Sequence, residues 1–504
     1  MTCFFITTSA LLAQGKFARS VEDMTGIEYY AGSVIQTTDG GYLVTRPIDL
    51  GLGDGTDCLV FKMNPSGNIT WAQVIQGTRF DHSHCIVQTS DNGFAIVGET
   101  YSFGDENLFI SKFNSSGDLQ WYKTFGGDGY DQAHSAVLTA DNGLVVAGFT
   151  SSSGAGSYDF FVLKTDANGN FMWAWTYGGT NQDIAHSIVQ TTDGGFAVAG
   201  WTRSFTVGGS DLLILRLNSN GSPIWARTFG GSSDEEPGCP TAIIQTFDGG
   251  FVITGHTQSS GVGGHDLFVL KLASDGSLSW AKTIGGVNDD DGRSIMQTQD
   301  GDLVIAGGTK SFGIGGEDFF VVKLDASGNL LGARTFGTSS DDGANCIIPT
   351  QDGDLAIMGY VDQGFLLLKV DGNGDYPGCV SSCSPSINAW SPNTSSRSVG
   401  VNYIPSMGAA SPVITAPTLI VTDLCAPLDA RENEAAVLKD RITCSLVSGG
   451  LLFSLWEDID LRIYGADGRL AYSGELKKGQ TRIPLDPGVY LWQAGPYKGK
   501  AVVR

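Results

Sequence analysis

Positive charge is scarce in this sequence. Lys and Arg total 30 residues against 53 Asp and Glu, charged residues of both signs make up only 16% of the 504, and the formal net charge is -23. A chain with this balance repels phosphate, which excludes nucleic acid and anionic membrane surfaces as its principal partners. Cations, calcium and neutral glycans remain compatible with it. From Leu428 onwards basic and acidic residues nearly balance, so the upstream part of the chain carries the negative charge.

Long apolar runs and the familiar catalytic motifs are also missing. After the first residues, no stretch reaches the 18 apolar residues that a membrane-spanning helix needs, so we expect no transmembrane segment. The sequence contains no Gly-x-Ser-x-Gly elbow, no His-Glu-x-x-His pair and no phosphate-binding loop. These absences exclude the common serine hydrolases, zinc proteases and P-loop enzymes. Pairs of carboxylates are frequent, but the sequence assigns none of them the separation of a glycosidase pair.

Cysteines are few, and the first residues suggest an oxidising compartment for them. Residues 1–14 have the apolar core and cleavage region of a secretory signal peptide without its basic leading segment, which predicts a truncated start. A buried first strand is the alternative. Of the nine cysteines, Cys3 would leave with the signal peptide, and Cys379, Cys383 and Cys425 are the best disulfide candidates, with their connectivity open. Because no His cluster accompanies them, we expect no structural zinc site.

Glycine, in contrast, is abundant, with 70 residues, and many of them belong to one recurring turn. The first copy is Asp39-Gly-Gly-Tyr42, and related copies return at intervals of 50 to 55 residues. They begin at Asp91, Asp141, Asp193, Asp248, Asp300 and Asp352. A period near 50 predicts a radial array of small sheets, and seven copies predict seven sheets. A β-solenoid is the competing architecture, but its repeats are usually far shorter.

One repeat can be followed through residues 187–231. Short β-rich runs at 187–191, 196–202, 211–217 and 224–229 are separated by turns that contain Gly, Asn and Asp, as in a four-stranded antiparallel sheet. The seventh repeat lacks its fourth run, and residues 16–21 match residues 224–229 almost position for position. We therefore predict an all-β fold in which residues 16–380 form a seven-bladed β-propeller closed by an N-terminal strand, because closure removes exposed strand edges.

The composition changes after the propeller. Residues 381–427 are rich in Ser, Pro, Thr and Ala and predict an extended linker. Residues 428–504 alternate short β-rich runs with turns and predict a small C-terminal β-sandwich.

This C-terminal segment resembles a known family. Ile463–Arg469, Ile483–Tyr490 with its Gly-Val-Tyr element, and the basic terminus Lys498–Arg504 resemble the type A C-terminal sorting domain of the type IX secretion system. The resemblance implies a Bacteroidota-type cell, the type IX secretion machinery as a partner, and release or anchoring at the outer cell surface. The repeats themselves resemble bacterial β-propeller repeats of secreted proteins, a family with little assigned chemistry.

Residues that recur in nearly every repeat predict a scaffold role. A cation recurs on the third strand, at Lys62, Lys112, Lys164, Arg216, Lys271, Lys323 and Lys369. We expect this cation to pair with a repeated Asp. An Asp recurs shortly before the inner strand, at Asp81, Asp131, Asp183, Asp290 and Asp342, and repetition favours a structural tie over a ligand site.

Variable residues gather on the loops that lead into the inner strands and on those that join the second and third strands. We expect these loops to share one face of the ring, where binding normally resides. His84, His134 and His186 are equivalent in three consecutive repeats, and Arg293 and Asn345 take the same position in two others. They could ring the mouth of the central channel and bind a metal or an anionic ligand. The alternative is that duplication copied a polar residue that binds nothing.

Two further segments carry clustered oxygen atoms. An insertion in the fifth repeat places Asp234, Glu235 and Glu236 on an expected acidic rim. The loop over 371–375 has the alternating oxygen ligands of a calcium loop but lacks the downstream bidentate Glu, and it also matches an ordinary turn. Its candidate ligands are Asp371, Asn373 and Asp375. Calcium is the one cofactor that we consider.

These patterns favour a secreted or cell-surface propeller that acts as a binding or adhesion module for an extracellular glycan or protein, without catalysis of its own. An extracellular polysaccharide-degrading hydrolase or lyase is the competing hypothesis, and the insertion at Asp234–Glu236 is its modest candidate site. A structural component of a surface or matrix is the third. We expect a monomer.

Overall fold

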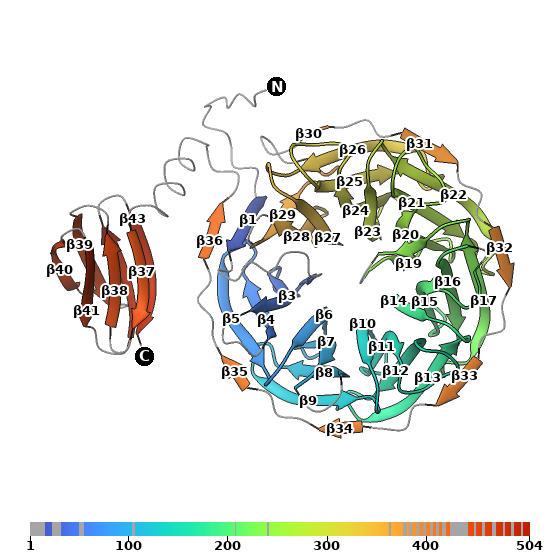
Figure 1. Ribbon diagram of the computed structural model, residues 1–504, viewed down its shortest axis with the longest axis horizontal. Helices are drawn as coiled ribbons and strands as arrows, with labels where there is room; N and C mark the ends of the chain where they lie inside the picture. The colour runs from blue at the N-terminus through green and yellow to red at the C-terminus, as the bar shows by residue number, and fades with distance from the viewer. Residues whose placement is uncertain are drawn as a thin grey trace. The chain divides into compact units, whose positions relative to one another are not determined.

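The computed structural model describes residues 16–22, 32–49, 55–102, 106–206, 208–238, 241–361 and 364–375, and beyond these only the strands between residues 381 and 503. The larger of two compact units ends at Leu424. It is a ring of seven antiparallel sheets around a common axis, so the predicted all-β, seven-bladed propeller is confirmed (Figure 1). The described part of the chain contains no helix with the length and hydrophobicity that crossing a bilayer takes.

Each of the first four blades runs from an inner strand to a fourth strand at the rim. Blade 1 comprises β2 (Ser33–Gln36), β3 (Tyr42–Asp49), β4 (Thr56–Met63) and β5 (Ile69–Gln76). Blade 2 comprises β6 (Asp81–Gln88), β7 (Phe94–Thr100), β8 (Asn107–Phe113) and β9 (Leu119–Phe125). Blade 3 comprises β10 (Asp131–Leu138), β11 (Leu144–Thr150), β12 (Asp159–Thr165) and β13 (Phe171–Gly178). Blade 4 comprises β14 (Asp183–Gln190), β15 (Phe196–Thr202), β16 (Asp211–Leu217) and β17 (Pro223–Gly230).

The other three blades follow the same plan with two variations. In blade 5 the inner strand is split into β18 (Glu235–Pro237) and β19 (Ile243–Gln245), followed by β20 (Phe251–Thr257), β21 (Asp266–Leu272) and β22 (Leu278–Gly285). Blade 6 comprises β23 (Asp290–Gln297), β24 (Leu303–Thr309), β25 (Asp318–Leu324) and β26 (Leu330–Phe336). Blade 7 comprises β27 (Asp342–Pro349), β28 (Leu355–Val361), β29 (Gly364–Val370) and, from the N-terminal segment, β1 (Phe17–Glu22).

Strand β1 pairs with β29 in antiparallel register, with Phe17 opposite Lys369 and Glu22 opposite Gly364. The Phe17 side chain is buried in the cluster that joins blades 1 and 7, and its ring meets the ring of Tyr42 edge-on at 5.6 Å. One blade is thus assembled from segments that lie more than 300 residues apart in the sequence.

The recurring Asp-Gly-Gly turn is held by the cation on the third strand of its own blade. In blade 1 the Asp39 carboxylate accepts hydrogen bonds from the Gly41 N–H at 3.0 Å, the Thr37 hydroxyl at 2.5 Å and the Lys62 ammonium at 2.7 Å. Gly40 has a φ of 78°, a conformation that glycine adopts without strain. The equivalent ion pairs are Lys112–Asp91, Lys164–Asp141, Arg216–Asp193, Lys271–Asp248 and Lys369–Asp352. In blade 6 the cation Lys323 pairs instead with Asp302, two residues after the first Asp of its turn. The predicted pairing of these cations with a repeated Asp is confirmed in six of the seven blades.

The core of the ring lies between the blades. One buried cluster joins Val97 and Ile110 of blade 2 to Val146, Phe161 and Leu163 of blade 3, and similar clusters follow around the ring. Each fully buried large apolar side chain contributes roughly 1.5–3 kcal/mol of transfer free energy, so the blades are held to one another by many equivalent contacts. A frame of this kind can carry different residues at its ends without changing its shape.

The segment after the ring differs from the sequence-based prediction. Composition predicted an extended linker over 381–427, and the structure instead forms seven short strands there. They are β30 (Ser381–Ser382), β31 (Ser386–Ala389), β32 (Asn393–Ser396), β33 (Gly400–Tyr403), β34 (Met407–Ala409), β35 (Val413–Thr415) and β36 (Ile420–Asp423). Each pairs with the outermost strand of one blade, in the order 6, 5, 4, 3, 2, 1 and 7, so the segment runs back around the rim (Figure 1, orange strands).

The physical reason lies in the open edge of each blade. A fourth strand at the rim presents unpaired N–H and C=O groups, and any extended segment can satisfy them through its backbone alone. Strand β33, for example, pairs with β13 from Trp175 opposite Tyr403 to Gly178 opposite Gly400. Because this pairing demands an extended backbone and little of the side chains, the composition of a linker does not reveal it.

The second compact unit contains the C-terminal strands. They are β37 (Ile442–Val447), β38 (Gly450–Leu455), β39 (Ile459–Gly465), β40 (Leu470–Leu476), β41 (Gly479–Pro484), β42 (Gly488–Ala494) and β43 (Tyr497–Val503). They form a three-stranded sheet, β37-β38-β41, and a four-stranded sheet, β40-β39-β42-β43. The Gly488-Val-Tyr element begins β42, which lies between β39 and the last strand.

Candidate functional site

The loops that lead into the inner strands meet the loops between the second and third strands of the preceding blade. The Asp183 N–H donates to the Tyr158 carbonyl at 2.8 Å, and the Asp290 N–H donates to the His265 carbonyl at 2.7 Å. Equivalent bonds run from Asp131 to Glu106, from Glu235 to Ser210 and from Asp342 to Glu317. The expectation that both sets of loops share one end of the ring is therefore confirmed. We call this end the loop face; the Asp-Gly-Gly turns join strands at the opposite end.

The Asp at the start of each inner strand ties its own lead-in loop. Asp131 accepts hydrogen bonds from the Gly127 N–H at 2.9 Å, the Ser152 hydroxyl at 2.6 Å and the Thr150 hydroxyl. Its side chain is buried, and burial raises the pKa of its carboxyl above the usual value. Asp183 and Asp290 make the same set of contacts. The predicted structural role of this position is confirmed.

A bulge recurs in the inner strand of five blades near the loop face. Between the first three and the remaining residues of the strand the pairing with the second strand skips one residue. The skipped residues are His84, His134, His186, Arg293 and Asn345. A bulged residue is released from the ladder and its side chain is re-aimed, so these five residues share one structural position as well as one sequence position.

The bulge also explains a repeated glycine on the facing strand. A Cβ atom on Gly98 would lie 1.8 Å from the His82 carbonyl oxygen, and one on Gly200 would lie 2.0 Å from the Ile184 carbonyl oxygen. Only glycine allows the bulged strand to approach this closely. The residue after this glycine faces the bulge and differs from blade to blade: Glu99, Phe149, Trp201, His256, Gly308 and Tyr360.

Three of the bulge residues touch one another along one side of the axis. The ring centroids of His84 and His134 are 5.2 Å apart, and those of His134 and His186 are 5.0 Å apart. Glu99 joins them from the second strand of blade 2, with one carboxylate oxygen 2.5 Å from His84 Nε2 and the other 2.8 Å from His82 Nδ1. We call these five residues the histidine cluster.

Burial and Glu99 set different charges within the histidine cluster. Burial lowers the pKa of His84, but the negative charge of Glu99 and its hydrogen bond outweigh burial and raise that pKa above the usual value. Burial lowers the pKa of His134 to about 4, with a further contribution from the charge of His84, and it lowers the pKa of His186 as well. Although burial opposes it, contact with the two histidines holds the pKa of Glu99 at about 2. Among the three bulge histidines, His84 is thus the protonatable imidazole beside the buried carboxylate of Glu99, and His134 and His186 are neutral.

A metal site was one of the expectations for these histidines. Among the residues that the structure describes, no three His, Cys, Asp or Glu side chains are arranged so that they could hold a metal ion. The observed partners are instead a carboxylate for His84 and, for His134 Nδ1, the Ala185 carbonyl oxygen at 2.9 Å. The histidines therefore present hydrogen-bonding groups at the axis.

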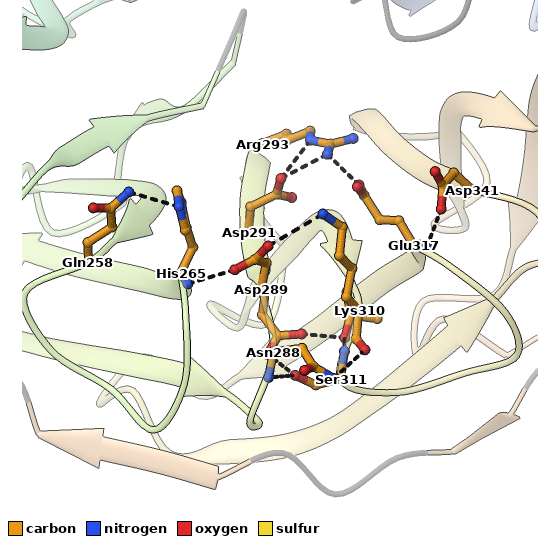
Figure 2. Close-up of polar contacts among 12 residues, drawn as sticks. Gln258, His265, Asn288, Asp289, Asp291, Arg293, Lys310, Ser311, Glu317 and Asp341 are labelled. Atoms are coloured by element: carbon orange, nitrogen blue, oxygen red, sulfur yellow. Dashed lines mark hydrogen bonds and ion pairs between the residues drawn. The ribbon is translucent and has the colours of Figure 1, made fainter.

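Arg293 occupies the same bulge position in blade 6, where it faces Asp291 and Glu317 (Figure 2). Its guanidinium donates to Asp291 at 2.8 and 3.1 Å and to Glu317 of the following loop. The third guanidinium nitrogen donates to Asn345 Oδ1 and to the Tyr360 hydroxyl, both at 3.3 Å. We call these five residues the arginine cluster. The bulge residues of blades 6 and 7 are thus joined directly, and every carboxylate of the cluster faces a cation.

The insertion of blade 5 does not form one continuous acidic rim. Glu235 is fully buried and takes the place of the Asp tie, because its carboxylate accepts bonds from the Gly231 N–H at 2.7 Å and the Thr257 hydroxyl at 2.8 Å. Asp234 accepts bonds from the Ser210 N–H and hydroxyl. Of the three predicted rim residues, only Asp234 and Glu236 reach the surface. The physical reason is that a carboxylate ties the lead-in loop in the neighbouring blades 4 and 6, and Glu fills this position in blade 5.

The calcium candidate lies in an outer turn of blade 7. Asp371 Oδ1 accepts the N–H groups of Asn373 and Asp375 at 3.0 and 2.8 Å. Asn373 Oδ1 accepts a bond from Lys323, and Asp375 accepts one from Arg334 at 2.6 Å. The Asp166 turn of blade 3 has the same pair of backbone bonds, to Asn168 and Asn170. The oxygen atoms are thus engaged as in the other outer turns, and calcium binding stays a prediction.

The cysteine expectations fall largely outside the described residues. Cys379, Cys383 and Cys425 all lie there, so their pairing stays a prediction. Cys58, Cys85 and Cys346 are buried free thiols in the described part of the ring.

Sequence reasoning missed several residues of this site. His82, Glu99, Asp291, Glu317 and Tyr360 were not singled out, yet they hold the bulge residues in place. A signal for Glu99 and Tyr360 was present, because the position between the repeated glycine and the end of the second strand changes in every blade. Asp291 and Glu317 carry no comparable signal, since acidic residues are common in all these loops.

Comparison with known proteins identifies one family over a single repeat. A family model described as a domain of unknown function (DUF5122) β-propeller matches residues 193–223, from the Asp-Gly-Gly turn of blade 4 to the start of its fourth strand. No curated protein matches the sequence.

Solved structures with a similar fold are remote. PorZ, described as an essential bacterial surface component of the type IX secretion system of Porphyromonas gingivalis, is 12% identical with a TM-score of 0.40, and the match covers 93% of this chain and 58% of PorZ. The α-L-arabinofuranosidase Arb93A of Fusarium graminearum is 10% identical with a TM-score of 0.39 over 71% of this chain and 98% of that enzyme. A puromycin hydrolase is 11% identical with a TM-score of 0.42, over 71% of this chain and 54% of the hydrolase. A secretion-system surface component and two hydrolases thus share this remote likeness, and only the geometry of the site bears on function.

Proposed function

We propose that the chain is a secreted or cell-surface β-propeller that acts as a binding or adhesion module, with an extracellular glycan or protein ligand at the axial part of the loop face. The observation that carries the proposal is the bulge position. The same backbone feature recurs in five blades and presents His84, His134, His186, Arg293 and Asn345. Variable side chains on a rigid, repeated frame are the usual basis of specific recognition.

The state of the carboxylates favours binding over catalysis. A glycosidase needs one carboxyl group that exchanges a proton with the substrate and a second that stays ionised beside it. At the axis, Glu99 is held by two histidines, and Asp291 and Glu317 are held by Arg293. Each of these three carboxylates is already paired with a basic side chain, which favours a positioning role over the role of a glycosidase acid or nucleophile. An extracellular polysaccharide-degrading enzyme is therefore the alternative that the experiment below must reject.

Binding is tested with the intact chain on an array of glycans and extracellular proteins, with and without calcium. We expect a ligand to be bound and left unchanged, and we expect His186→Ala to weaken its binding by about tenfold, the loss of one or two hydrogen bonds at the site. Ser90→Ala, an exposed position in a turn at the opposite end of the ring, is the matched control and should bind as the parent does.

Two outcomes would contradict this proposal. Shortened oligosaccharides on the array would establish the enzyme alternative. Equal affinity of the His186→Ala and Ser90→Ala proteins would show that the ligand does not bind at the axis.

We further propose that the type IX secretion machinery exports the chain through residues 428–504. The resemblance of this segment to type A sorting domains supports the proposal. A chain that ends at residue 427 should remain inside a Bacteroidota host and disappear from the outer surface in a surface-labelling assay, whereas the full chain should be released or displayed. Unchanged display of the shortened chain would rule out this route.

A further inference from the structure

A second feature of the loop face lies away from the axis, where the loops of blades 3, 4 and 5 meet. They line an open cleft with a volume of about 470 Å³. Its walls include Ser157, Asn181, Gln182, Arg203, Thr206 and Asp234. These side chains are polar, and the volume lies in the range of small-ligand sites.

Arg203 is fixed on one wall of this cleft. Its N–H donates to the Gln182 carbonyl at 2.7 Å, and its guanidinium donates to Gln182 Oε1 at 3.2 Å. The guanidinium lies 5.2 Å from the centre of the Trp201 ring, which restricts it further. The side chain is exposed, and none of the ion pairs of the described residues includes it. Arg203 lines the cleft, and the bond to Gln182 uses only one of the five N–H donors of its guanidinium.

Asp234, from the neighbouring blade 5, supplies a carboxylate that accepts hydrogen bonds. The Ser210 N–H and hydroxyl donate to Oδ1 at 2.6 and 2.9 Å, which anchors the carboxylate and leaves Oδ2 as an acceptor. These bonds, and the charge of Arg203, lower the pKa of Asp234, so it is ionised at neutral pH. The cleft thus presents fixed donors and a fixed acceptor.

The equivalent loop residues of blade 6 carry a different set of charges from those of blade 4. Lys310 takes the place of Arg203, Asn288 that of Asn181 and Asp289 that of Gln182 (Figure 2). Lys310 lies 3.4 Å from Asp289 and is neutralised by it. In blade 4 the amide Gln182 replaces this acid, so the cation keeps hydrogen-bonding capacity for a ligand.

We propose that the cleft between blades 3, 4 and 5 is a binding subsite for a neutral oligosaccharide. Vicinal hydroxyl groups can accept two hydrogen bonds from the planar guanidinium and donate to the carboxylate. The negative charges of Asp234 and of nearby Glu236 repel acidic sugars, and the positive charge of Arg203 repels amino sugars. A ligand without charge therefore fits both walls. This inference rests on the proposed binding function and adds a site distinct from the axis.

The test compares three variants of the full chain on arrayed neutral, uronic-acid and sulfated oligosaccharides. We expect binding to neutral oligosaccharides, and we expect Arg203→Met and Asp234→Asn each to weaken it by about tenfold or more. Lys310→Met changes the matching position of blade 6 and should leave the affinity as it is. Unfolding midpoints equal to that of the parent would show that the exposed Arg203 acts through the ligand.

The outcomes separate this inference from the proposed function. Neutral-glycan binding that survives Arg203→Met but falls with His186→Ala would overturn the cleft and leave the axial site. Binding of proteins but of no neutral oligosaccharide would do the same. Preference for uronic acids, strengthened by Asp234→Asn, would refute the neutral class.

Discussion

Replacement of Glu99 by Gln should lower the free energy of unfolding by about 2 kcal/mol near pH 6, because it removes the charge that two histidines share in a nearly dry environment. The Glu99 side chain is only 4% exposed, and its oxygens lie 2.5 and 2.8 Å from His84 and His82. Gln preserves the shape, so the loss measures the charge and not the packing. Denaturant titration of both proteins at a series of pH values is the measurement.

The difference between the two proteins should peak in mildly acidic solution. The pKa of Glu99 is lowered from 4.5 to about 2, so its contribution is present above pH 4.5 and is lost as the pH falls toward 2. The pKa of His84 is raised from 6.5, so its contribution is present below pH 6.5 and is lost as the pH rises through the raised value. The two proteins should therefore differ most between about pH 4.5 and 6.5.

Asp128→Asn is the control for this comparison. It makes the same chemical change on an exposed loop of the same face and should follow the parent protein across the pH range. A Glu99→Gln effect of equal size at every pH would mean that the loss does not come from the charge that Glu99 shares with the histidines.

Replacement of Arg293 by Met should be the most damaging change at the axis, with a loss of about 3 kcal/mol or more in the free energy of unfolding. It leaves Asp291 and Glu317 beside each other without a cation, and their side chains are only 28% and 13% exposed. Asn345 and Tyr360 also lose a donor. The measurement is the denaturation midpoint at neutral pH.

Two further proteins test the reason for that loss. Lys310→Met removes a cation from the same blade, but Lys310 and its partner Asp289 are each 48% exposed, so the change should stay within about 1 kcal/mol. Adding Asp291→Asn and Glu317→Gln to Arg293→Met should restore much of the stability. If this triple variant were as unstable as Arg293→Met, the unpaired carboxylates would not be the cause.

The bulge position is where the sequence and the structure contribute different information. Alignment of the repeats placed His84, His134, His186, Arg293 and Asn345 at one position, and the structure gives that position a backbone form. It also separates them into two charged clusters, because their partners come from other strands and loops. Glu99 reaches His84 from the second strand, and Glu317 reaches Arg293 from a loop 24 residues away.

The sequence by itself determined the ring. The spacing of the Asp-Gly-Gly turns, the recurring Lys or Arg and the alternating strands specify seven blades. Each of these features acts within one repeat, through local hydrogen bonds and burial. Only the tertiary structure decided how the Ser-, Pro- and Thr-rich segment 381–423 is used and which side chains meet on the loop face. Edge pairing depends on an open strand in space, and charge neutralisation depends on which residues of different blades approach one another. Neither the open strand edge nor the approach of residues from different blades is encoded within a single repeat.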